Sequence, residues 1–470
     1  MLKLKAKRTI EPTTNIVLIS CYELGHQPAG IASSMGFLHE AGYQATVLDL
    51  SVTKLNVEQV RQAKFVGISV PMHTALRLGV RVATEIRSVN PACHICFYGL
   101  YAILSANYLL TTVADSVIGG EYEEKLLALI KAVETGEKIN IENVSTTTSL
   151  TSPVLKRLHF PIPDRNQLPS LEVYARLIYQ GEQRLSGYVE ASRGCLHHCT
   201  HCPIPPVYQG RFFVVPRETV LTDIGNLVRA GAQHITFGDP DFLNGPGHSL
   251  RIVQAMHNQF PQLTFDFTTK VEHIIKHREL FPLLGALGCL FVISAVESLS
   301  ELVLARLAKG HTRADVFTAL EITRNASIAL RPTFVPFTPW STLDDYIELL
   351  EFIHCQDLVD HVDPIQYAIR LLVPPGSLLL TQAGTEQWLG PLVEESFSYS
   401  WQHTDIRLDQ LQQQVRSLVE TAVKENRDCY YIFREILALA YTARGDQCAE
   451  LPVPSFLRRR PPRLTEAWFC

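Results

Sequence analysis

The feature that most constrains the fold of this chain is a regular alternation of short apolar runs with amphipathic segments between residues 15 and 135. The runs have the length of strands and are rich in β-branched and aromatic residues. The segments between them have apolar residues at helical spacing. They cover residues 15–20, 46–50, 65–70, 94–98 and 116–118. This alternation predicts a doubly wound parallel sheet, whose ligands would lie beyond the carboxyl ends of its strands.

A second alternation of strand and helix patterns begins near residue 187. Its expected strands cover residues 187–190, 234–237, 264–268, 290–295, 330–334 and 363–372. A closed barrel of this type needs eight strands, and this series has fewer. The sequence therefore predicts an α/β chain in which a partial (β/α)6 barrel follows the first sheet.

The segments outside these two series differ in composition. Residues 136–185 are rich in Ser and Thr and are interrupted by prolines, which predicts a linker or surface strap. Beyond residue 386, apolar residues recur at three-four spacing, which indicates a helical extension. The expected division is 1–135 for the first domain, 136–185 for the linker, 186–385 for the barrel, 386–445 for the helical extension and 446–470 for the tail.

The overall composition excludes several classes of protein. Of the 470 residues, 46% are hydrophobic, so there is ample material for cores. The formal net charge is −5 and no basic block dominates, which argues against a nucleic-acid partner. The longest apolar stretch, 283–296, is too short to cross a bilayer, and no signal-peptide pattern precedes the first strand. We therefore expect a soluble cytoplasmic enzyme with no membrane partner.

Three of the 11 cysteines stand apart from the rest. The odd total argues against a disulfide framework, but Cys195, Cys199 and Cys202 share one short segment after the first barrel strand. Iron–sulfur clusters take thiolate ligands, and cubane clusters usually take four. Three cysteines from one loop would leave one iron open to another ligand, as a catalytic or substrate-binding site requires. The CxxxCxxC spacing therefore predicts a cluster.

Zinc is the alternative for this segment, because His197, His198 and His201 lie among the cysteines. Structural zinc loops usually supply two pairs of ligands separated by a longer stretch. No second pair stands at a comparable spacing in this sequence. The pattern favours the iron–sulfur cluster over zinc.

With Cys195, Cys199 and Cys202 on the loop after the first strand of a partial barrel, the chain resembles the radical SAM superfamily. The resemblance implies a 4Fe-4S cluster whose open iron binds S-adenosylmethionine (SAM), and a carbon radical formed by reductive C–S cleavage. It also implies a small-molecule substrate and a reductant such as flavodoxin or ferredoxin. Three reactions stay open: methyl transfer, hydrogen abstraction with rearrangement, and transfer of the 3-amino-3-carboxypropyl group.

Further segments resemble the strand ends that hold SAM in this superfamily. The segment 238–241 resembles the turn that meets the SAM amino group, and Glu297 is placed to meet the ribose or the amine. Arg331 would meet the SAM carboxylate, and His201 occupies the position that packs near the adenine. The cofactor-binding residues implied by the resemblance are His201, Gly238, Asp239, Asp241, Glu297 and Arg331.

The first domain resembles the cobalamin-binding domain that precedes many radical SAM barrels. Gly119, Gly120 and Glu121 at the last strand end fit that pattern. The DxHxxG signature of a lower-axial histidine does not occur, because His26 stands at the wrong interval from Gly30. A cobalamin site and a domain that only shapes the barrel mouth both stay open.

The last residues, Trp468, Phe469 and Cys470, resemble the stem of a radical SAM family with a CUAEP or CCAEP tail. In that family the cysteine is followed by selenocysteine or cysteine and then by Ala-Glu-Pro. The resemblance implies a catalytic role for Cys470, possible truncation at a selenocysteine codon, and binding of a soft element such as arsenic. An ordinary stop after an exposed cysteine is the alternative.

The sequence thus predicts a radical SAM enzyme, most simply a transferase, acting on an unidentified small molecule. A non-catalytic iron–sulfur protein that carries electrons or senses redox state is the alternative function. That alternative leaves the resemblances at 238–241, Glu297 and Arg331 without an explanation.

Overall fold

The structure is a computed structural model that describes residues 16–447, 458 and 460–466. Within it the chain forms two compact units. The first comprises the described residues up to Glu23 together with Gln27–Pro169. The second comprises Leu24–His26 and the described residues from Ser170 onwards.

The first unit is built on a six-stranded sheet with the order β2-β1-β3-β4-β5-β6. All pairs are parallel except β5 with β6. The strands are β1 (Ile16–Ser20), β2 (Thr46–Asp49), β3 (Phe65–Ser69), β4 (His94–Tyr98), β5 (Ser116–Ile118) and β6 (Ser145–Thr146). The first five agree with the expected strands to within a residue at each end. The order reverses between β1 and β3, which is the switch point where ligands bind in such sheets.

Helices on the first unit follow the apolar spacing of the sequence. In α3 (His73–Val89) the buried residues are Ala75, Leu76, Gly79, Ala83 and Ile86, at three-four spacing. The remaining helices are α1 (Ala29–Glu40), α2 (Val57–Gln62), α4 (Leu100–Leu104), α5 (Ala106–Thr112) and α6 (Glu123–Thr135). Strands β1, β3 and β4 are buried along most of their length, as strands covered on both faces should be.

The segment expected to be a linker, 136–185, is divided between the two units. Its first part adds β6 to the first sheet and buries Val144, Val154, Phe160 and Leu168. Its last part forms β7 (Arg176–Tyr179), the antiparallel partner of β8 (Glu182–Val189), in the second unit. Prolines and polar residues in this segment therefore mark a packed strap and the start of a hairpin.

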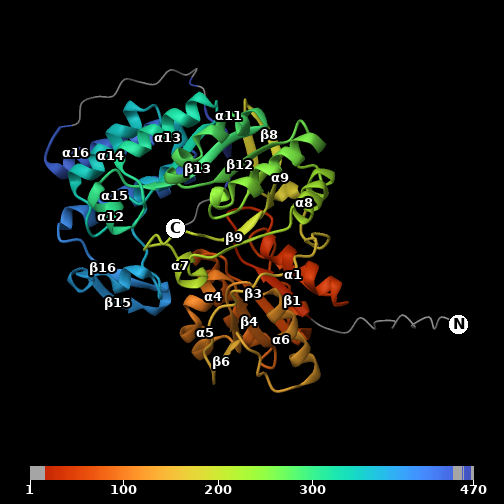
Figure 1. Ribbon diagram of the computed structural model, residues 1–470. Helices are drawn as coiled ribbons and strands as arrows, with labels where there is room; N and C mark the ends of the chain where they lie inside the picture. Colours follow the sequence, from red (N-terminus) through yellow and green to blue (C-terminus); the bar gives the residue numbers. More distant parts are fainter. Residues whose placement is uncertain (1–15, 448–457, 459, 467–470) are drawn as a thin grey trace. The chain divides into compact units, whose positions relative to one another are not determined.

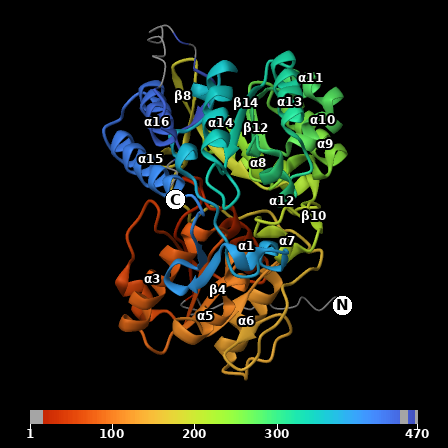
Figure 2. The ribbon, with the colours of Figure 1, turned by 90° about the vertical axis from the view of Figure 1, so that its left-hand side faces the viewer.

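The second unit contains a seven-stranded sheet with the order β14-β13-β12-β11-β8-β7-β17. Strands β8, β11, β12, β13 and β14 are parallel and form the curled half-barrel (Figures 1 and 2). Besides β7 and β8, the strands of this sheet are β11 (His234–Phe237), β12 (Thr264–Thr268), β13 (Cys289–Glu297), β14 (Ala329–Phe334) and the short β17 (Arg463–Leu464). The α/β class and the partial barrel are confirmed.

The strand expected over residues 363–372 differs in the structure. Residues Pro364–Ala368 form a 3-10 helix, η5, and Arg370 makes only an isolated bridge with Phe337. Pro364 has no backbone N–H to donate to a ladder, and the prolines after Val373 end any extended run. The Arg370 side chain instead contacts Asp409 and lies over the Trp401 ring.

Helices α8, α11 and α13 pack against strands of the half-barrel (Figure 1). Helices α13 and α14 each begin with a capping box, formed by Thr312 with Asp315 and by Thr342 with Asp345. The helices of this unit are α7 (Ile204–Tyr208), α8 (Arg217–Arg229), α9 (Pro246–Gln259), α10 (Val271–Lys276), α11 (Phe281–Ala286), α12 (Glu301–Arg306), α13 (Arg313–Asn325) and α14 (Leu343–Cys355), followed by α15 (Ile406–Lys424) and α16 (Cys429–Arg444).

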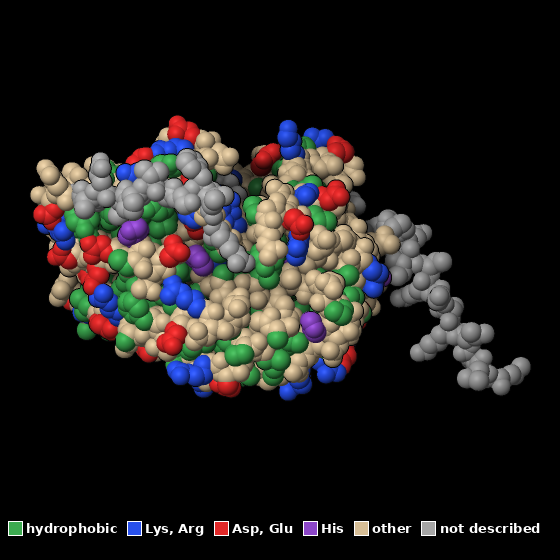
Figure 3. Space-filling view, turned by 90° about the horizontal axis from the view of Figure 1, so that it is seen from above, with side chains coloured by type: hydrophobic (Ala, Val, Ile, Leu, Met, Phe, Trp, Pro, Cys, Tyr) green, Lys and Arg blue, Asp and Glu red, His purple; other side chains and the backbone are tan. Residues whose placement is uncertain are grey.

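The region expected to be a helical extension begins with a hairpin of β15 (Leu389–Val393) and β16 (Ser398–Trp401). Helices α15 and α16 follow and lie side by side (Figure 2). Among the described residues, no helix combines the length and the apolar character needed to cross a membrane. On the face shown in Figure 3, acidic and basic side chains are interspersed, as on an ordinary solvated surface.

Candidate active site

The cysteine loop lies at the carboxyl end of the first half-barrel strand. Strand β8 ends at Val189, the short strand β9 (Ser192–Gly194) pairs with β10 (Phe212–Val214), and Cys195 follows directly. Cys199 lies four residues further on, and Cys202 precedes α7. Cys195 and Cys199 are buried and Cys202 is partly buried. One loop therefore presents all three thiols at the edge where this class of sheet binds its ligands.

Hydrogen bonds hold the middle of this loop at Thr200. Its backbone N–H donates to the Leu307 carbonyl at 3.0 Å, and its hydroxyl donates to the Arg306 carbonyl at 2.8 Å. Its carbonyl accepts from the Ser377 hydroxyl at 3.1 Å and from the Leu379 N–H at 3.2 Å. The loop is thus fixed from two sides before any cofactor binds.

The start of the loop is held by Asp239, which follows β11. Its carboxylate accepts from the Ser192 hydroxyl at 2.5 Å and from the Ala191 N–H at 2.9 Å. Burial raises the pKa of Asp239 to about 7, although both of these hydrogen bonds act to lower it. Asp239 therefore positions the cysteine loop through these contacts, and its direct contact with SAM stays a prediction.

The three thiols fit the iron–sulfur ligand role. Burial raises the pKa of Cys202 to about 12 and also raises that of Cys195. Bound metal cations are the charges that deprotonate such thiols. Soft thiolates on a preformed loop suit an iron–sulfur cluster.

Next to the cysteines lies a charged group, the buried pair of Glu297 and Lys309, with the partly buried His201 beside it. The carboxylate oxygen Oε1 of Glu297 is 3.2 Å from Lys309 Nζ and 3.1 Å from His201 Nε2. Burial alone would raise the pKa of Glu297, but the Lys309 ammonium and His201 hold it at about 2. The thiols of Cys199 and Cys202 in turn help to raise the pKa of Lys309. A carboxylate anion and an ammonium cation are therefore both kept at the cysteine loop.

Glu297 also has an uncommon backbone conformation. It ends β13 with φ at +67°, next to a register shift in the pairing with β14. A non-glycine residue in this region costs on the order of 1–3 kcal/mol and persists where the surroundings impose it. The pairs with Lys309 and His201 are the contacts that accompany this conformation.

A further buried histidine, His311, lies close to this charged group. Neither ring nitrogen has a hydrogen-bond partner among the described residues. Burial, with Lys309 and Lys270 nearby, lowers the pKa of His311 to about 4, so the ring is neutral at pH 7. A neutral imidazole offers one donor and one acceptor.

Gly238 and Asp241 end the β11 segment on which the SAM-amine prediction rests. A Cβ at Gly238 would lie 2.1 Å from the hydroxyl end of the Tyr188 ring, so a larger residue there would require Tyr188 to move. Asp241 accepts through Oδ1 from the Leu243 N–H and the Thr269 hydroxyl. Its Oδ2 is 2.8 Å from His273 Nδ1 and 3.6 Å from His197 Nε2. Gly238 and Asp241 both have contacts within the chain, and their SAM contacts stay predictions.

Arg331 lies deeper in the sheet than Glu297. It pairs in register with Ile293 on β13, four residues before Glu297, and its Nη2 is 2.9 Å from Asp363 Oδ2. At about 3.3 Å per residue, the two positions are roughly 13 Å apart along the strands. The structure therefore gives Arg331 a carboxylate partner within the chain, and its contact with SAM stays a prediction.

The structure thus brings Glu297 to His201 on the cysteine loop and attaches Asp239 to the start of that loop. Cys470 lies outside the described residues. Strand β17 pairs antiparallel with β7, and Glu466 beyond it contacts His26 at 2.9 Å. The His26 ring stacks on Tyr188 at 4.7 Å between centroids.

Sequence reasoning missed the roles of Lys309 and His273. Lys309 follows the short helix α12, and a lone lysine at such a position carries no signal of burial. His273 lies on α10, where nothing in the sequence distinguishes it from the nearby His277. Both are brought to the site by the curvature of the sheet, which a local pattern does not encode.

In the first unit, the chain itself fills the space beside the glycines that follow β5. Gly120 has φ at +75°, and a Cβ there would lie 2.1 Å from the Val154 carbonyl oxygen. Val154 bonds to the Gly119 carbonyl and accepts from the Glu121 N–H. With His26 committed to Glu466, these features require no cobalamin to explain them, and the residues do not fit a lower-axial histidine at this position.

Part of the second unit matches a known protein family. Residues 189–353 match the family model described as the radical SAM superfamily. This part of the chain is a radical SAM domain, which binds a 4Fe-4S cluster and SAM, and the cysteine loop lies within it.

Individual relatives point to the same class. The chain is 22% identical over 326 residues to the hopanoid C-3 methylase of Methylococcus capsulatus, covering 67% of this chain and 62% of the relative. The cobalamin-dependent SAM radical enzyme OxsB, solved with aqua-cobalamin, matches at TM-score 0.69 and 16% identity over 87% of this chain and 67% of that one. The radical SAM methyltransferase TsrM of Kitasatospora setae matches at TM-score 0.60 and 17% identity over 73% and 72%. The structural likenesses establish the fold, and the chain spans about three fifths of the curated relative.

Proposed function

We propose that this chain is a radical SAM transferase that reductively cleaves SAM and transfers a carbon-centred group to a small-molecule acceptor. The observation that carries the proposal is the cysteine loop of Cys195, Cys199 and Cys202 at the mouth of a half-barrel, beside the buried pair of Glu297 and Lys309. The methylase and methyltransferase relatives support transfer as the reaction type. When bound, the cluster supplies the electron that cleaves a C–S bond of SAM.

Lys309 has an electrostatic role in this proposal. Its ammonium is buried beside Cys199 and Cys202, where a cation favours the more negative, reduced form of a bound cluster. Glu297 keeps the net charge of the pair near zero. A buried pair of this kind stays ionised because each partner would be costly to bury alone.

Glu297 is also the residue best placed to meet SAM. Its pKa of about 2 keeps it anionic, as recognition of a SAM hydroxyl or amine requires. His201, held at 3.1 Å from Glu297, is proposed to pack near the adenine. Gly238 and Arg331 complete the proposed SAM contacts, through the backbone and the guanidinium respectively.

Which group is transferred is decided by the bond cleaved. Release of 5′-deoxyadenosine from SAM indicates the adenosyl radical, and release of 5′-methylthioadenosine indicates 3-amino-3-carboxypropyl transfer. We propose incubating reconstituted protein with SAM and a strong reductant and measuring both products. If neither product rises above background, the enzymatic function is overturned and the non-catalytic iron–sulfur alternative is favoured.

The reductant proposed for the cell is a flavodoxin or ferredoxin in the cytoplasm. A radical SAM domain takes its electron from an external donor. Replacing the chemical reductant by a reduced flavodoxin in the same assay tests this choice. Product formation that depends on flavodoxin supports it.

Cobalamin is named for OxsB, a neighbour in fold. The switch point between β1 and β3 is where a ligand of the first unit would lie. Because the strand-end glycines of the first unit and His26 of the second unit are engaged by the chain, we derive no step through cobalamin. Persistence of the methylcobalamin spectrum through gel filtration would establish that the cofactor nevertheless binds.

Cys470 is proposed to act on the transferred group, on the strength of the tail resemblance. Pairing of β17 with β7 supports the proposal because it attaches the preceding residues to the half-barrel sheet. Cys470→Ser is expected to keep the cluster and SAM binding while losing product. Unchanged turnover would contradict this role.

A further inference from the structure

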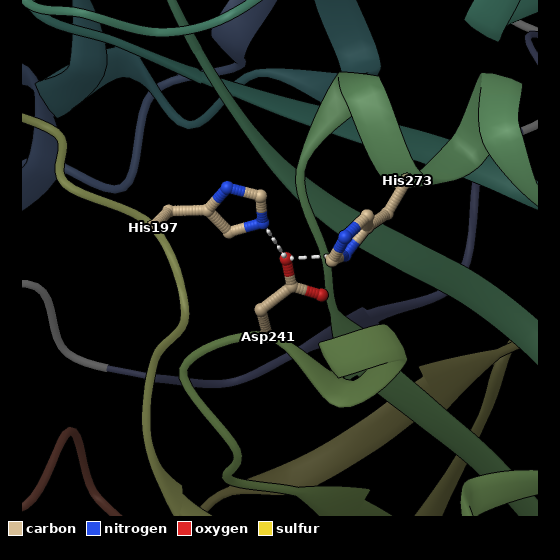
Figure 4. Close-up of side chains that lie close together, drawn as sticks. All are labelled: His197, Asp241 and His273. Carbon is tan, nitrogen blue, oxygen red and sulfur yellow. Dashed lines mark ion pairs between the residues drawn. The ribbon is translucent and has the colours of Figure 1, made fainter. Parts of the chain in front are cut away.

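Three side chains of metal-ligand type converge beside the cysteine loop. His197 lies on that loop between Cys195 and Cys199, Asp241 follows β11, and His273 lies on α10 (Figure 4). One ligand atom of each, two ring nitrogens and one carboxylate oxygen, lies within 4.8 Å of the other two. The side chains are 16%, 1% and 6% exposed, respectively. The convergence is therefore sheltered from solvent.

The carboxylate of Asp241 is fixed in its orientation. Its Oδ1 accepts from the Leu243 N–H at 3.1 Å and from the Thr269 hydroxyl at 2.6 Å. This leaves Oδ2 facing the two histidines, at 2.8 Å from His273 Nδ1 and 3.6 Å from His197 Nε2. The three atoms surround one point from three different elements of the second unit.

Judged by hydrogen-bond geometry, these three buried atoms are unsatisfied among the described residues, although His273 Nδ1 and Asp241 Oδ2 lie at ion-pair distance. A buried polar atom left without a partner costs about 1–3 kcal/mol, so such atoms call for an explanation. A single cation at their common point would satisfy all three at once.

We propose that His197, Asp241 and His273 bind one divalent first-row transition metal ion, at a site separate from the three cysteines. Two imidazoles and one carboxylate form a donor set that suits Zn²⁺ or Fe²⁺ and leaves coordination positions open. An open position beside the cysteine loop would bind an oxygen or nitrogen atom of the acceptor. Only this last role rests on the proposed transferase function.

Lys270 and Glu272 lie beside His197 and influence which of its ring nitrogens is free to bind a metal ion. Its Nδ1 is 3.1 Å from Lys270 Nζ and 3.7 Å from Glu272 Oε2. The role of each His197 ring nitrogen depends on the tautomer, and a proton on Nε2 would block the metal. Metal binding requires the proton on Nδ1, and Glu272 is the carboxylate that would accept it. Lys270 is itself 3.2 Å from Glu272, so it keeps a partner when the proton moves.

The test measures zinc bound to the full chain with its cluster reconstituted. After equilibrium dialysis against Zn²⁺, we expect one more ion per chain in the parent protein than in Asp241→Asn or His273→Ala. Asn retains the oxygen that caps Leu243, so Asp241→Asn preserves the loop. His277→Ala is the matched control, because His277 lies near His273, just after α10, and is not a ligand.

Two further variants test the proton arrangement. Lys270→Met is expected to tighten zinc binding, and Glu272→Gln to weaken it by about 10-fold. Misfolding would not raise the affinity for zinc, so tighter binding in Lys270→Met would have to come from the changed surroundings of His197. The iron content, which reports on the cluster loop, should be the same in all variants.

Two outcomes would overturn the proposal. One is equal zinc content in the parent protein, Asp241→Asn and His273→Ala. The other is displacement of the bound zinc by saturating SAM, which would assign Asp241 Oδ2 to the SAM amine. The SAM-cleavage assay is independent of both, so failure of the metal site and failure of the transferase function are distinguishable.

Discussion

In the first unit the carboxyl end of β5 is closed by the chain itself, because Val154 bonds to Gly119 and Glu121. In the second unit the ends of β11 and β13 carry Asp241 and Glu297, which face histidine and lysine side chains. In both units, the edge that binds ligands in such folds is the one formed by the carboxyl ends of the parallel strands. Both ends bury acidic side chains, including Glu121 and Glu123 in the first unit, but in the second unit the acids face histidine and lysine side chains.

This difference locates the chemistry. Buried charges and histidines destabilise a fold unless they are paired, so they are retained where function needs them. Glu297, Lys309 and His311 have perturbed pKa values at one sheet edge. The following predictions test whether the second unit alone holds the reactive site.

The largest effect is expected at the cysteine loop. Cys195→Ala, Cys199→Ala and Cys202→Ala should each abolish the cluster, which reconstitutes at about four irons per chain in the parent protein. Iron and sulfide analysis after anaerobic reconstitution measures this. Cys355→Ala, at an exposed position on α14, is the control and should keep full iron. A colourless, zinc-loaded parent protein would contradict the prediction.

Lys309→Met should lower SAM cleavage by about 100-fold or more, because it leaves the buried Glu297 anion with His201 in place of its ammonium partner. Removing one partner of a buried pair typically costs about 3–5 kcal/mol. Product release under excess reductant and the free energy of unfolding are the two measurements. Lys276→Met, at an exposed position of α10, is the matched control. Retained cleavage in Lys309→Met would remove the electrostatic role.

Gly120→Ala should destabilise the first unit by about 3 kcal/mol. The residue has positive φ, and the added Cβ would meet the Val154 carbonyl. Denaturant unfolding measures the change, and iron content should stay at the parent level. If stability is unchanged while methylcobalamin binding falls, the strand end serves a cofactor and the contrast between the units fails.

His311 should make the metal-free protein less stable in mild acid. Its folded pKa is about 4, below the ordinary value of 6.5, so the unfolded chain takes up a proton that the folded chain refuses. Stability falls as the pH drops from about 6.5 towards 4, by about 2 kcal/mol at about pH 5. Melts of the parent and His311→Gln at about pH 7.5 and 5 measure it. Identical pH dependence in both proteins would show that His311 is not the group responsible.

The smallest effect is expected at an exposed ion pair of α15, Arg416 with Glu420. Arg416→Ala should change stability by no more than about 0.5 kcal/mol, because solvent screens the pair. Thermal unfolding measures it. A larger loss would indicate that surface charge, as well as the buried site, stabilises the second unit.

Much of this molecule follows from local patterns in its sequence. The five parallel strands of the first unit can be predicted from the sequence, because strands buried on both faces form continuous apolar runs. Cys195, Cys199 and Cys202 are readable because one short loop carries all three ligands. The expected strand at 363–372 was wrong because prolines and the pairing of Arg370 with Asp409 outweighed its apolar composition.

Contacts between residues far apart in the chain were decided only by the tertiary structure. His197, Asp241 and His273 come from three separate elements, and Lys309 reaches Glu297 only because β13 ends beside the cysteine loop. The SAM contact expected of Asp241 stays a prediction, and the structure shows its Oδ2 facing two histidines. The sequence determined the two sheets and the cysteine loop, since periodicity and spacing are local. The curvature of the second sheet determined which side chains meet, since that depends on packing across the whole half-barrel.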